Sequence, residues 1–180
     1  GSALPRIDGI YEQILAGEEK LFVGSRPSTL PDEINQGLER QSFAIAYALQ
    51  QLGYVGRCSF DHLVVGDLDR DPQLKVTECN GRWGGTSTPM HLVDRVISGD
   101  RPPYRAQDFI HQDLIGVPFT EICQRIGGHL FDASSGEGQF LLYNVGPLTL
   151  SGKFDVIAIA ESPDEADRWM TEVLPELLGV

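Results

Sequence analysis

The fold is decided by residues 53–89, GYVGRCSFDHLVVGDLDRDPQLKVTECNGRWGGTSTP. Two apolar segments in it, 57–65 and 73–80, lie on either side of GDLDRDP, whose Gly, Asp and Pro residues are turn formers. This pattern predicts a β-hairpin. A glycine-rich loop follows, and then a helix of two to three turns that Thr88 caps, with Pro89 in its first turn.

The position of the turn predicts which residues of the hairpin face each other. A turn centred between Asp69 and Arg70 gives three facing pairs on one side of the sheet: Asp61 with Glu78, Leu63 with Val76, and Val65 with Leu74. Strand alternation places Asn80 on the same side. That side is therefore predicted to be apolar near the turn and rich in oxygen atoms at the open end.

The oxygen-rich end of the hairpin has the side chains of a divalent-metal site. Two directly opposed residues have β-carbons roughly 4.5–5.5 Å apart, which is destabilising for two carboxylates unless a cation lies between them. Asp61, Glu78 and the side-chain carbonyl of Asn80 are hard oxygen donors, which suit Mg²⁺ or Mn²⁺, whereas zinc favours His and Cys. The alternative is an inert, solvated acidic end of a hairpin.

The loop after Asn80 favours anion binding. Glycine allows backbone amides to approach an anion closely, and a helix N-terminus favours negative charge, so Gly84, Gly85 and Thr86 are candidates to hold phosphate groups. Arg82 is a candidate clamp for a carboxylate or phosphate, because its guanidinium group binds such anions with two hydrogen bonds. The alternative is that Arg82 neutralises the acidic residues and that the glycines only form a turn.

The rest of the chain predicts further helices and strands around this hairpin. Apolar residues at helical spacing after Pro31 predict a long helix at 32–52, and the Gly, Ser and Pro residues of 24–33 predict an exposed loop. The remaining predicted elements are a short helix or strand at 10–17, a helix at 117–127, strands at 139–145 and 154–160, and a helix at 163–178 that begins with Ser162–Glu165. Adjacent prolines in 98–108 predict a domain boundary, which divides the chain into 1–107 and 108–180.

Composition narrows the classes of function. A net charge of -12 counts against non-specific binding of nucleic acid, which needs clustered Lys and Arg. No stretch of about 18 apolar residues and no signal peptide occur, so we expect a cytoplasmic protein without a membrane partner. Three cysteines without CxxC spacing indicate neither a disulfide framework nor a zinc ribbon. A start without Met suggests that an N-terminal part of the polypeptide is missing.

The strings GYVGRCSFDHLVV and LKVTECNGRWGGTSTP resemble the last two sheet strands of the ATP-grasp superfamily, in which G-x-x-x-x-D is followed by E-x-N-x-R and a glycine-rich loop. This resemblance covers about 53–90. It implies an α+β fold, with an ATP-grasp C-terminal subdomain (an antiparallel sheet with helices) followed by a small α+β C-terminal domain. It also implies ATP and Mg²⁺ (or Mn²⁺) as cofactors, Asp61, Glu78 and Asn80 as metal ligands, and Arg82 beside the substrate or its acyl phosphate.

The late segment YNVGPLTLSGKFDVIAIAESPDEA, together with ECNGRWGGTSTP, resembles the ATP-grasp peptide ligases of the pheganomycin type. Such enzymes join a carboxylate to an amine, so the implied partners are small-molecule or peptide carboxylate and amine substrates. The family's ATP-binding lysine, glycine-rich flap and adenine pocket have no room before residue 32. We therefore expect this chain on its own to bind ATP weakly or not at all, and to lack ligase activity.

Two other classes of function remain open. The Asp and Glu of the hairpin also resemble the metal site of restriction-type nucleases, but those enzymes usually place a lysine two residues after the Glu, where this chain has Asn80. The second alternative is a non-catalytic binding or assembly module derived from the ATP-grasp fold.

Overall fold

The computed structural model describes residues 3–68 and 70–180, which form two compact units. Unit 1 comprises the residues up to Tyr11 together with Ser28–Thr88, and unit 2 comprises Glu12–Pro27 together with Pro89–Val180. The two units are interleaved along the sequence. The chain enters unit 2 at Glu12, returns to unit 1 at Ser28, and enters unit 2 again at Pro89. The predicted division between 107 and 108 falls inside a strand of unit 2, Tyr104–Ile110, so it does not coincide with the division into these units.

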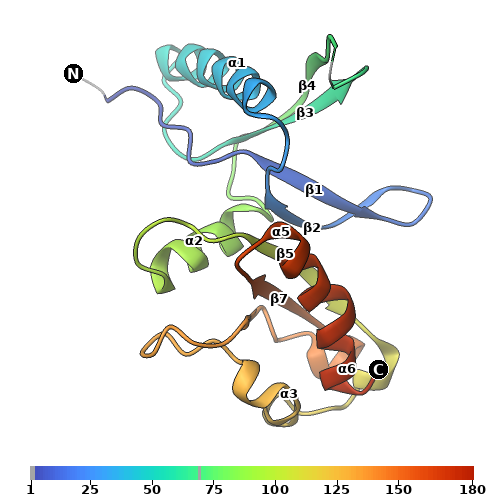
Figure 1. The fold of residues 1–180 in the computed structure, drawn as a ribbon. Helices are drawn as coiled ribbons and strands as arrows, with labels where there is room; N and C mark the ends of the chain where they lie inside the picture. The colour runs from blue at the N-terminus through green and yellow to red at the C-terminus, as the bar shows by residue number, and fades with distance from the viewer. Residues whose placement is uncertain (1–2, 69) are drawn as a thin grey trace. The chain divides into compact units, whose positions relative to one another are not determined.

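Unit 1 is built from the predicted long helix and the predicted hairpin. Helix α1 (Asp32–Gln51) lies beside the two-stranded sheet of β3 (Ser59–Val65) and β4 (Gln73–Asn80), as Figure 1 shows. Ile34 and Leu38 are buried on α1, and the helix approaches the sheet so closely at Gly37 that a β-carbon there would meet Leu74 Cδ1 at 2.6 Å. Helix α2 (Ser87–Val96) follows the hairpin and contains the division between the units.

The predicted register of the hairpin is confirmed at its open end and is wrong towards the turn. Asp61 faces Glu78 as predicted, but the register then shifts, so that Leu63 faces Lys75 and Val65 faces Gln73. Thr77 is the extra residue of a β-bulge, and its hydroxyl donates a hydrogen bond to the carbonyl oxygen of Asp61 at 3.1 Å. The predicted pairs of Leu63 with Val76 and of Val65 with Leu74 are therefore wrong. Asp69, at the predicted centre of the turn, lies outside the described residues.

Unit 2 is organised around a five-stranded sheet in the order β1-β2-β5-β7-β6. The strands are β1 (Tyr11–Ala16), β2 (Leu21–Pro27), β5 (Tyr104–Ile110), β6 (Phe140–Tyr143) and β7 (Lys153–Ile159). Those predicted at 139–145 and 154–160 are confirmed as β6 and β7. The exposed loop predicted at 24–33 is wrong at its start, because Gly24 and Ser25 are buried in β2. The predicted boundary segment 98–108 likewise contains most of β5.

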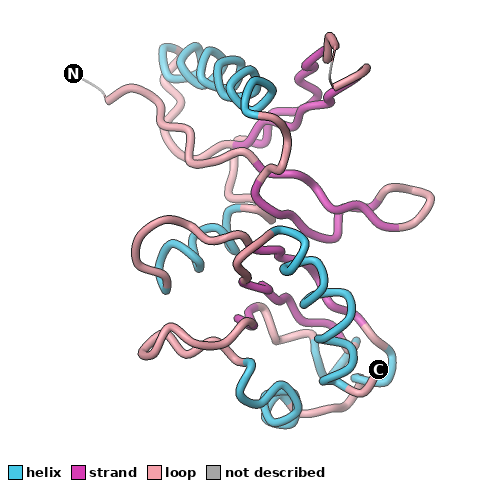
Figure 2. The backbone as a smooth tube through the Cα atoms, in the orientation of Figure 1, coloured by secondary structure: helices cyan, strands magenta, loops and turns pink. Residues whose placement is uncertain are grey.

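The helices of unit 2 cover the sheet and complete its core. They are α3 (Phe119–Ile126), α4 (Leu148–Ser151), α5 (Pro163–Arg168) and α6 (Leu174–Leu178), with single turns at Gln112–Leu114 and Gly127–His129. A π-helical turn, Trp169–Val173, joins α5 to α6, so that the predicted helix 163–178 runs without a break, as the tube in Figure 2 shows. Ser162 caps it by accepting a hydrogen bond from the amide of Glu165 at 3.2 Å.

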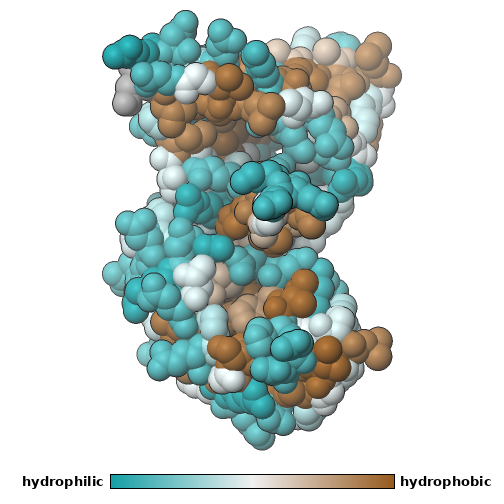
Figure 3. Space-filling model, turned by 90° about the vertical axis from the view of Figure 1, so that its right-hand side faces the viewer, coloured by the Kyte–Doolittle hydropathy of each residue, from teal (hydrophilic) through white to brown (hydrophobic). Residues whose placement is uncertain are grey.

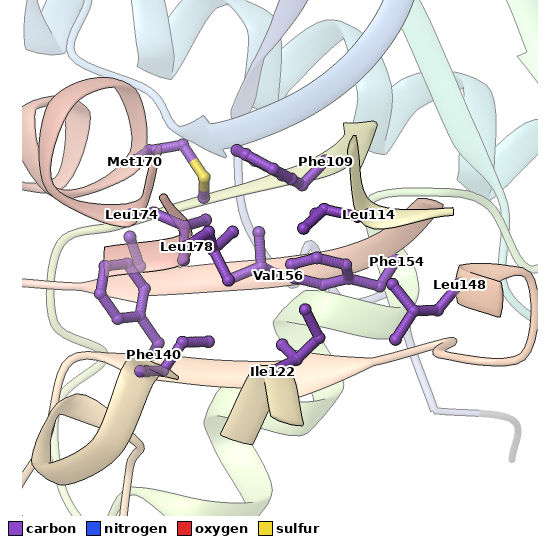
Figure 4. Packing of buried hydrophobic residues seen from close by; sticks show 12 residues of the cluster. Phe109, Leu114, Ile122, Phe140, Leu148, Phe154, Val156, Met170, Leu174 and Leu178 are labelled. Carbon is purple, nitrogen blue, oxygen red and sulfur yellow. The ribbon is translucent and has the colours of Figure 1, made fainter. Parts of the chain in front are cut away.

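The main core of unit 2 lies between the sheet and these helices. Phe154 and Val156 of β7 are fully buried, and Leu174 and Leu178 of α6 point toward them (Figure 4). Every residue of β7 from Phe154 to Ile159 is buried, which fits its place between β5 and β6 in the sheet. Within the described part of the chain, no helix has the length and apolar character needed to cross a membrane.

Candidate functional site

The structure brings Asp61, Glu78 and Asn80 together at the open end of the hairpin in unit 1. Asp61 on β3 directly faces Glu78 on β4. The side-chain amide of Asn80, the last residue of β4, donates to Asp61 Oδ2 at 3.4 Å. The bulge at Thr77 lies just beyond this cluster, so the shift in register leaves the three residues at the positions predicted for them.

Arg82 contacts Asn80 rather than the carboxylates. Its Nη2 donates to Asn80 Oδ1 at 3.0 Å, and its Nη1 donates to the carbonyl oxygen of Trp83 at 3.4 Å. Among residues 3–68 and 70–180, Arg82 makes no ion pair with Asp61 or Glu78. The guanidinium group therefore lies against the side-chain oxygen of Asn80, the atom predicted to bind a metal ion at this cluster.

The loop between Arg82 and α2 is fixed by its own hydrogen bonds. The amide of Gly84 donates to Ser87 Oγ at 3.2 Å, and Trp83 Nε1 donates to Thr88 Oγ1 at 2.8 Å. Because α2 begins at Ser87, the prediction that Thr88 caps this helix is wrong. The amide of Gly84 is already bonded, so Gly85 and Thr86 supply the remaining backbone amides of the predicted anion-binding loop ahead of the helix.

Two residues that the sequence did not single out support this loop. The guanidinium group of Arg57 lies 5.0 Å from the centre of the Trp83 ring and forms an ion pair with Asp8 at 2.8 Å. The hydroxyl of Tyr54 donates to the carbonyl oxygen of Arg57 at 2.7 Å. Nothing in the local spacing indicates these contacts, because Asp8 and Trp83 are distant from Arg57 in the sequence. They give the loop a defined position next to the acidic cluster.

The cluster has the composition of a shared magnesium site rather than of a metal cage made only by protein. Within the described residues, no three side chains of His, Cys, Asp or Glu converge as a set of metal ligands. Magnesium is usually held by one or two carboxylates together with substrate phosphates and water, which two carboxylates and one amide oxygen can match. Burial raises the pKa of the Cys58 thiol near this cluster, and the neighbouring Cys79 adds to this effect. Metal binding by Asp61, Glu78 and Asn80 stays a prediction.

Comparison with known proteins gives information on the fold alone. No family model and no curated protein matches the sequence. The structure is similar to the crystal structure of the phosphoribosylaminoimidazole carboxylase ATPase subunit from Aquifex aeolicus, with a TM-score of 0.51 and 15% sequence identity over 92% of this chain. The aligned region is 50% of that subunit, so this chain spans half its length. The similarity supports the predicted α+β fold, with antiparallel sheets and helices.

Proposed function

We propose that this chain is the C-terminal part of an ATP-dependent ligase that joins a carboxylate to an amine through an acyl phosphate. The observation that carries the proposal is the direct pairing of Asp61 with Glu78, with the Asn80 amide bonded to Asp61. Two facing carboxylates without a bound cation are unfavourable, and the residues around them are those expected beside nucleotide phosphates. The similarity of fold to an ATPase subunit is consistent with this function.

Each residue of the cluster has a role in the proposal. Asp61, Glu78 and Asn80 would hold Mg²⁺ or Mn²⁺, which neutralises the phosphates of ATP when it is bound. Gly85 and Thr86, with Gly84 shaping the turn, would offer backbone amides to the phosphates. Arg82 would orient the carboxylate substrate or its acyl phosphate. Substrates of the peptide type, as in the ligases of pheganomycin biosynthesis, are part of the same proposal.

Paramagnetic broadening by Mn²⁺ tests the metal site directly. We expect substoichiometric Mn²⁺, added without nucleotide, to broaden the NMR signals of amides around Asp61, Glu78 and Asn80 in labelled protein. Glu78→Gln should reduce the broadening at this site. Glu39→Gln, which removes the same charge from an exposed position on α1, should leave it unchanged.

The outcomes separate the proposal from its alternatives. Equal broadening in wild type and Glu78→Gln would contradict a metal site at the hairpin. An absence of selective broadening by Mn²⁺ would favour a non-catalytic binding or assembly module. Cleavage of plasmid DNA in the presence of Mg²⁺, lost in Glu78→Gln, would instead identify a nuclease.

A further inference from the structure

A recess in unit 2 lies apart in sequence from every residue of the proposed metal site. It forms where the end of β7, the start of α5 and the loop 127–139 meet, and its volume is about 620 Å³. This size is within the range of about 300–1,000 Å³ that is usual for sites that bind small molecules. The recess belongs to one unit, because all of its lining residues lie between Gly128 and Trp169.

Hydrogen bonds hold the aromatic side chains of the recess in place. The rings of His129 and Trp169 lie 5.3 Å apart and are tilted by 51°. His129 Nδ1 shares a hydrogen bond with Gln139 Oε1 at 2.9 Å, and Trp169 Nε1 donates to Glu165 Oε1 at 3.3 Å. The two rings therefore offer a preformed apolar wall to a ligand, and little side-chain freedom is lost on binding.

The polar side chains of the recess give it a negative charge. Glu137, Glu161 and Glu165 line it, and its lining includes no Lys or Arg. Both oxygens of Glu165 are engaged, since Oε2 accepts a hydrogen bond from the amide of Glu161 at 3.1 Å. By contrast, the carboxylates of Glu137 and Glu161 are exposed and form no ion pair with any residue that the structure describes. These two groups are available to a ligand.

A metal ion does not suit this recess. Three convergent ligands of the type His, Cys, Asp or Glu are found nowhere in the described chain, so the carboxylates do not meet at one point. The spread of charge along an aromatic wall suits a longer cation with an apolar body. The guanidinium group of Arg168 already lies 5.4 Å from the centre of the Trp169 ring, so the carboxylates, rather than this ring, would place the positive charge of a ligand.

We propose that this recess binds a small organic cation that carries ammonium or guanidinium groups on an alkyl chain. Glu137 and Glu161 pair with the charged groups, and the rings of His129 and Trp169 cover the hydrocarbon part. The proposal does not depend on the function of the hairpin, because none of its residues belongs to that cluster.

Agmatine, which has an ammonium group and a guanidinium group on a four-carbon chain, is the probe for the test. The chain has 2 Trp residues, so a Trp83→Phe background makes Trp169 the only source of tryptophan fluorescence. We expect agmatine to change this fluorescence with a Kd on the order of 0.1–1 mM, at an ionic strength matched with NaCl. The combined Glu137→Gln and Glu161→Gln substitutions should raise the Kd at least about fivefold, because both pairing groups are lost.

Matched controls separate specific binding from general attraction to an acidic protein. Glu172→Gln removes one charge from an exposed position close to Trp169 in the sequence but outside the recess, and it should leave the Kd unchanged. N-acetylagmatine, which lacks the ammonium charge, should bind more weakly than agmatine. The proposal is overturned if agmatine produces no saturable change, or if the double variant binds it as tightly as the wild type.

Discussion

Asp155 is a buried carboxylate in the middle of the sheet of unit 2. It lies on β7, is 8% exposed, and directly faces Asp108 on β5. Its Oδ2 accepts a hydrogen bond from the side chain of Asn144 at 2.9 Å, whereas its Oδ1 has no partner among the residues that the structure describes. Burial raises the pKa of Asp155, and the Asp108 carboxylate adds to this effect, while the hydrogen bond from Asn144 and the charge of Lys153 oppose it. The ionised form of Asp155 is therefore a source of instability.

Replacing this carboxylate with an amide should stabilise the protein at neutral pH. Because the pKa of Asp155 is higher in the folded state, the unfolded chain loses this proton first as the pH rises from about 4, and stability falls until the folded pKa is passed. Asp155→Asn removes that loss and offers an N–H group to Asp108. We expect a gain of about 1–3 kcal/mol in the free energy of unfolding at pH 7.5, measured by urea denaturation.

The pH dependence of this gain in stability shows whether the charge of Asp155 or its packing is the cause. At pH 3.5 the carboxyl group is mostly protonated in both states, so the difference between Asp155→Asn and wild type should be much smaller. Asp100→Asn, in an exposed loop, should have no comparable effect at either pH. A gain of the same size at both values would show that packing, rather than the charge of Asp155, accounts for it.

In unit 1, Glu78 is a second carboxylate that directly faces another carboxylate across a sheet. It is exposed and faces Asp61, so without a cation the two charges repel each other. In metal-free buffer we expect Glu78→Gln to raise the free energy of unfolding by about 0.2–1 kcal/mol. Thermal unfolding in excess EDTA measures this change, and the gain should shrink as NaCl is added, because salt screens charges on exposed side chains. A loss of stability in Glu78→Gln would mean that the carboxylate already has a favourable structural role.

Among the helices and strands, local patterns in the sequence identify the hairpin, the long helices and strands β6 and β7, but not the interior strands β2 and β5 of the sheet in unit 2. The apolar spacing after Pro31 predicts α1 to within one residue, because the helix depends on its own amphipathic face. Strand β2 contains Gly and Pro, and strand β5 alternates apolar and polar residues only over its first four positions. They are strands because of their distant partners, β5 pairing with β7 and β2 with β5. The β-propensities of neighbouring residues do not indicate pairing with a distant strand.

Gly24 shows what the pairing of β2 with β5 requires. It faces Gln107, and a β-carbon at Gly24 would clash with the carbonyl oxygen of Ala106 and with the side chain of Gln107. Gly24→Ala should therefore lower the free energy of unfolding by about 1–3 kcal/mol, the usual cost of overpacking. The control is Gly128→Ala, because a β-carbon at Gly128 would meet nothing within 4 Å. Urea denaturation of both variants checks the difference, and equal stabilities would show that β2 can move away from β5 without cost.

The position of the candidate site is predicted from the sequence better than any other part of the chain, because its residues lie close together on one hairpin. Asp61, Glu78 and Asn80 occupy consecutive positions on one face of one hairpin, and the bulge at Thr77 leaves their pairing intact. The contact between Arg82 and Asn80 Oδ1 is also local, but its geometry depends on side-chain conformations that no spacing specifies. The recess beside Trp169 could not be predicted, since it joins a loop, a strand end and a helix from separate parts of unit 2.

The two units differ in how much apolar surface they bury. Ile34 and Leu38 are the only buried apolar side chains in the described residues of unit 1, and its sheet has two strands. Unit 1 also exposes Leu63 by 56% and Val65 by 43%, and brown hydrophobic patches are visible on the surface in Figure 3. Unit 2 has a continuous core around Phe154, Val156 and Leu174. A two-stranded sheet is only marginally stable without further packing, so local opening of unit 1 should require less free energy.

Hydrogen exchange can measure this difference in stability residue by residue. We expect the amides of β7 and α6 to exchange slowest, with opening free energies close to that of global unfolding. The amides of β3 and β4 should exchange at least about tenfold faster, which corresponds to about 1.4 kcal/mol or more. Mg²⁺ with a nucleotide analogue should slow the exchange of β3 and β4 selectively if the acidic cluster binds them, and this slowing should be lost in Glu78→Gln. Equal protection of β4 and β7 in the metal-free protein would instead show that the two units unfold together, despite the small core of unit 1.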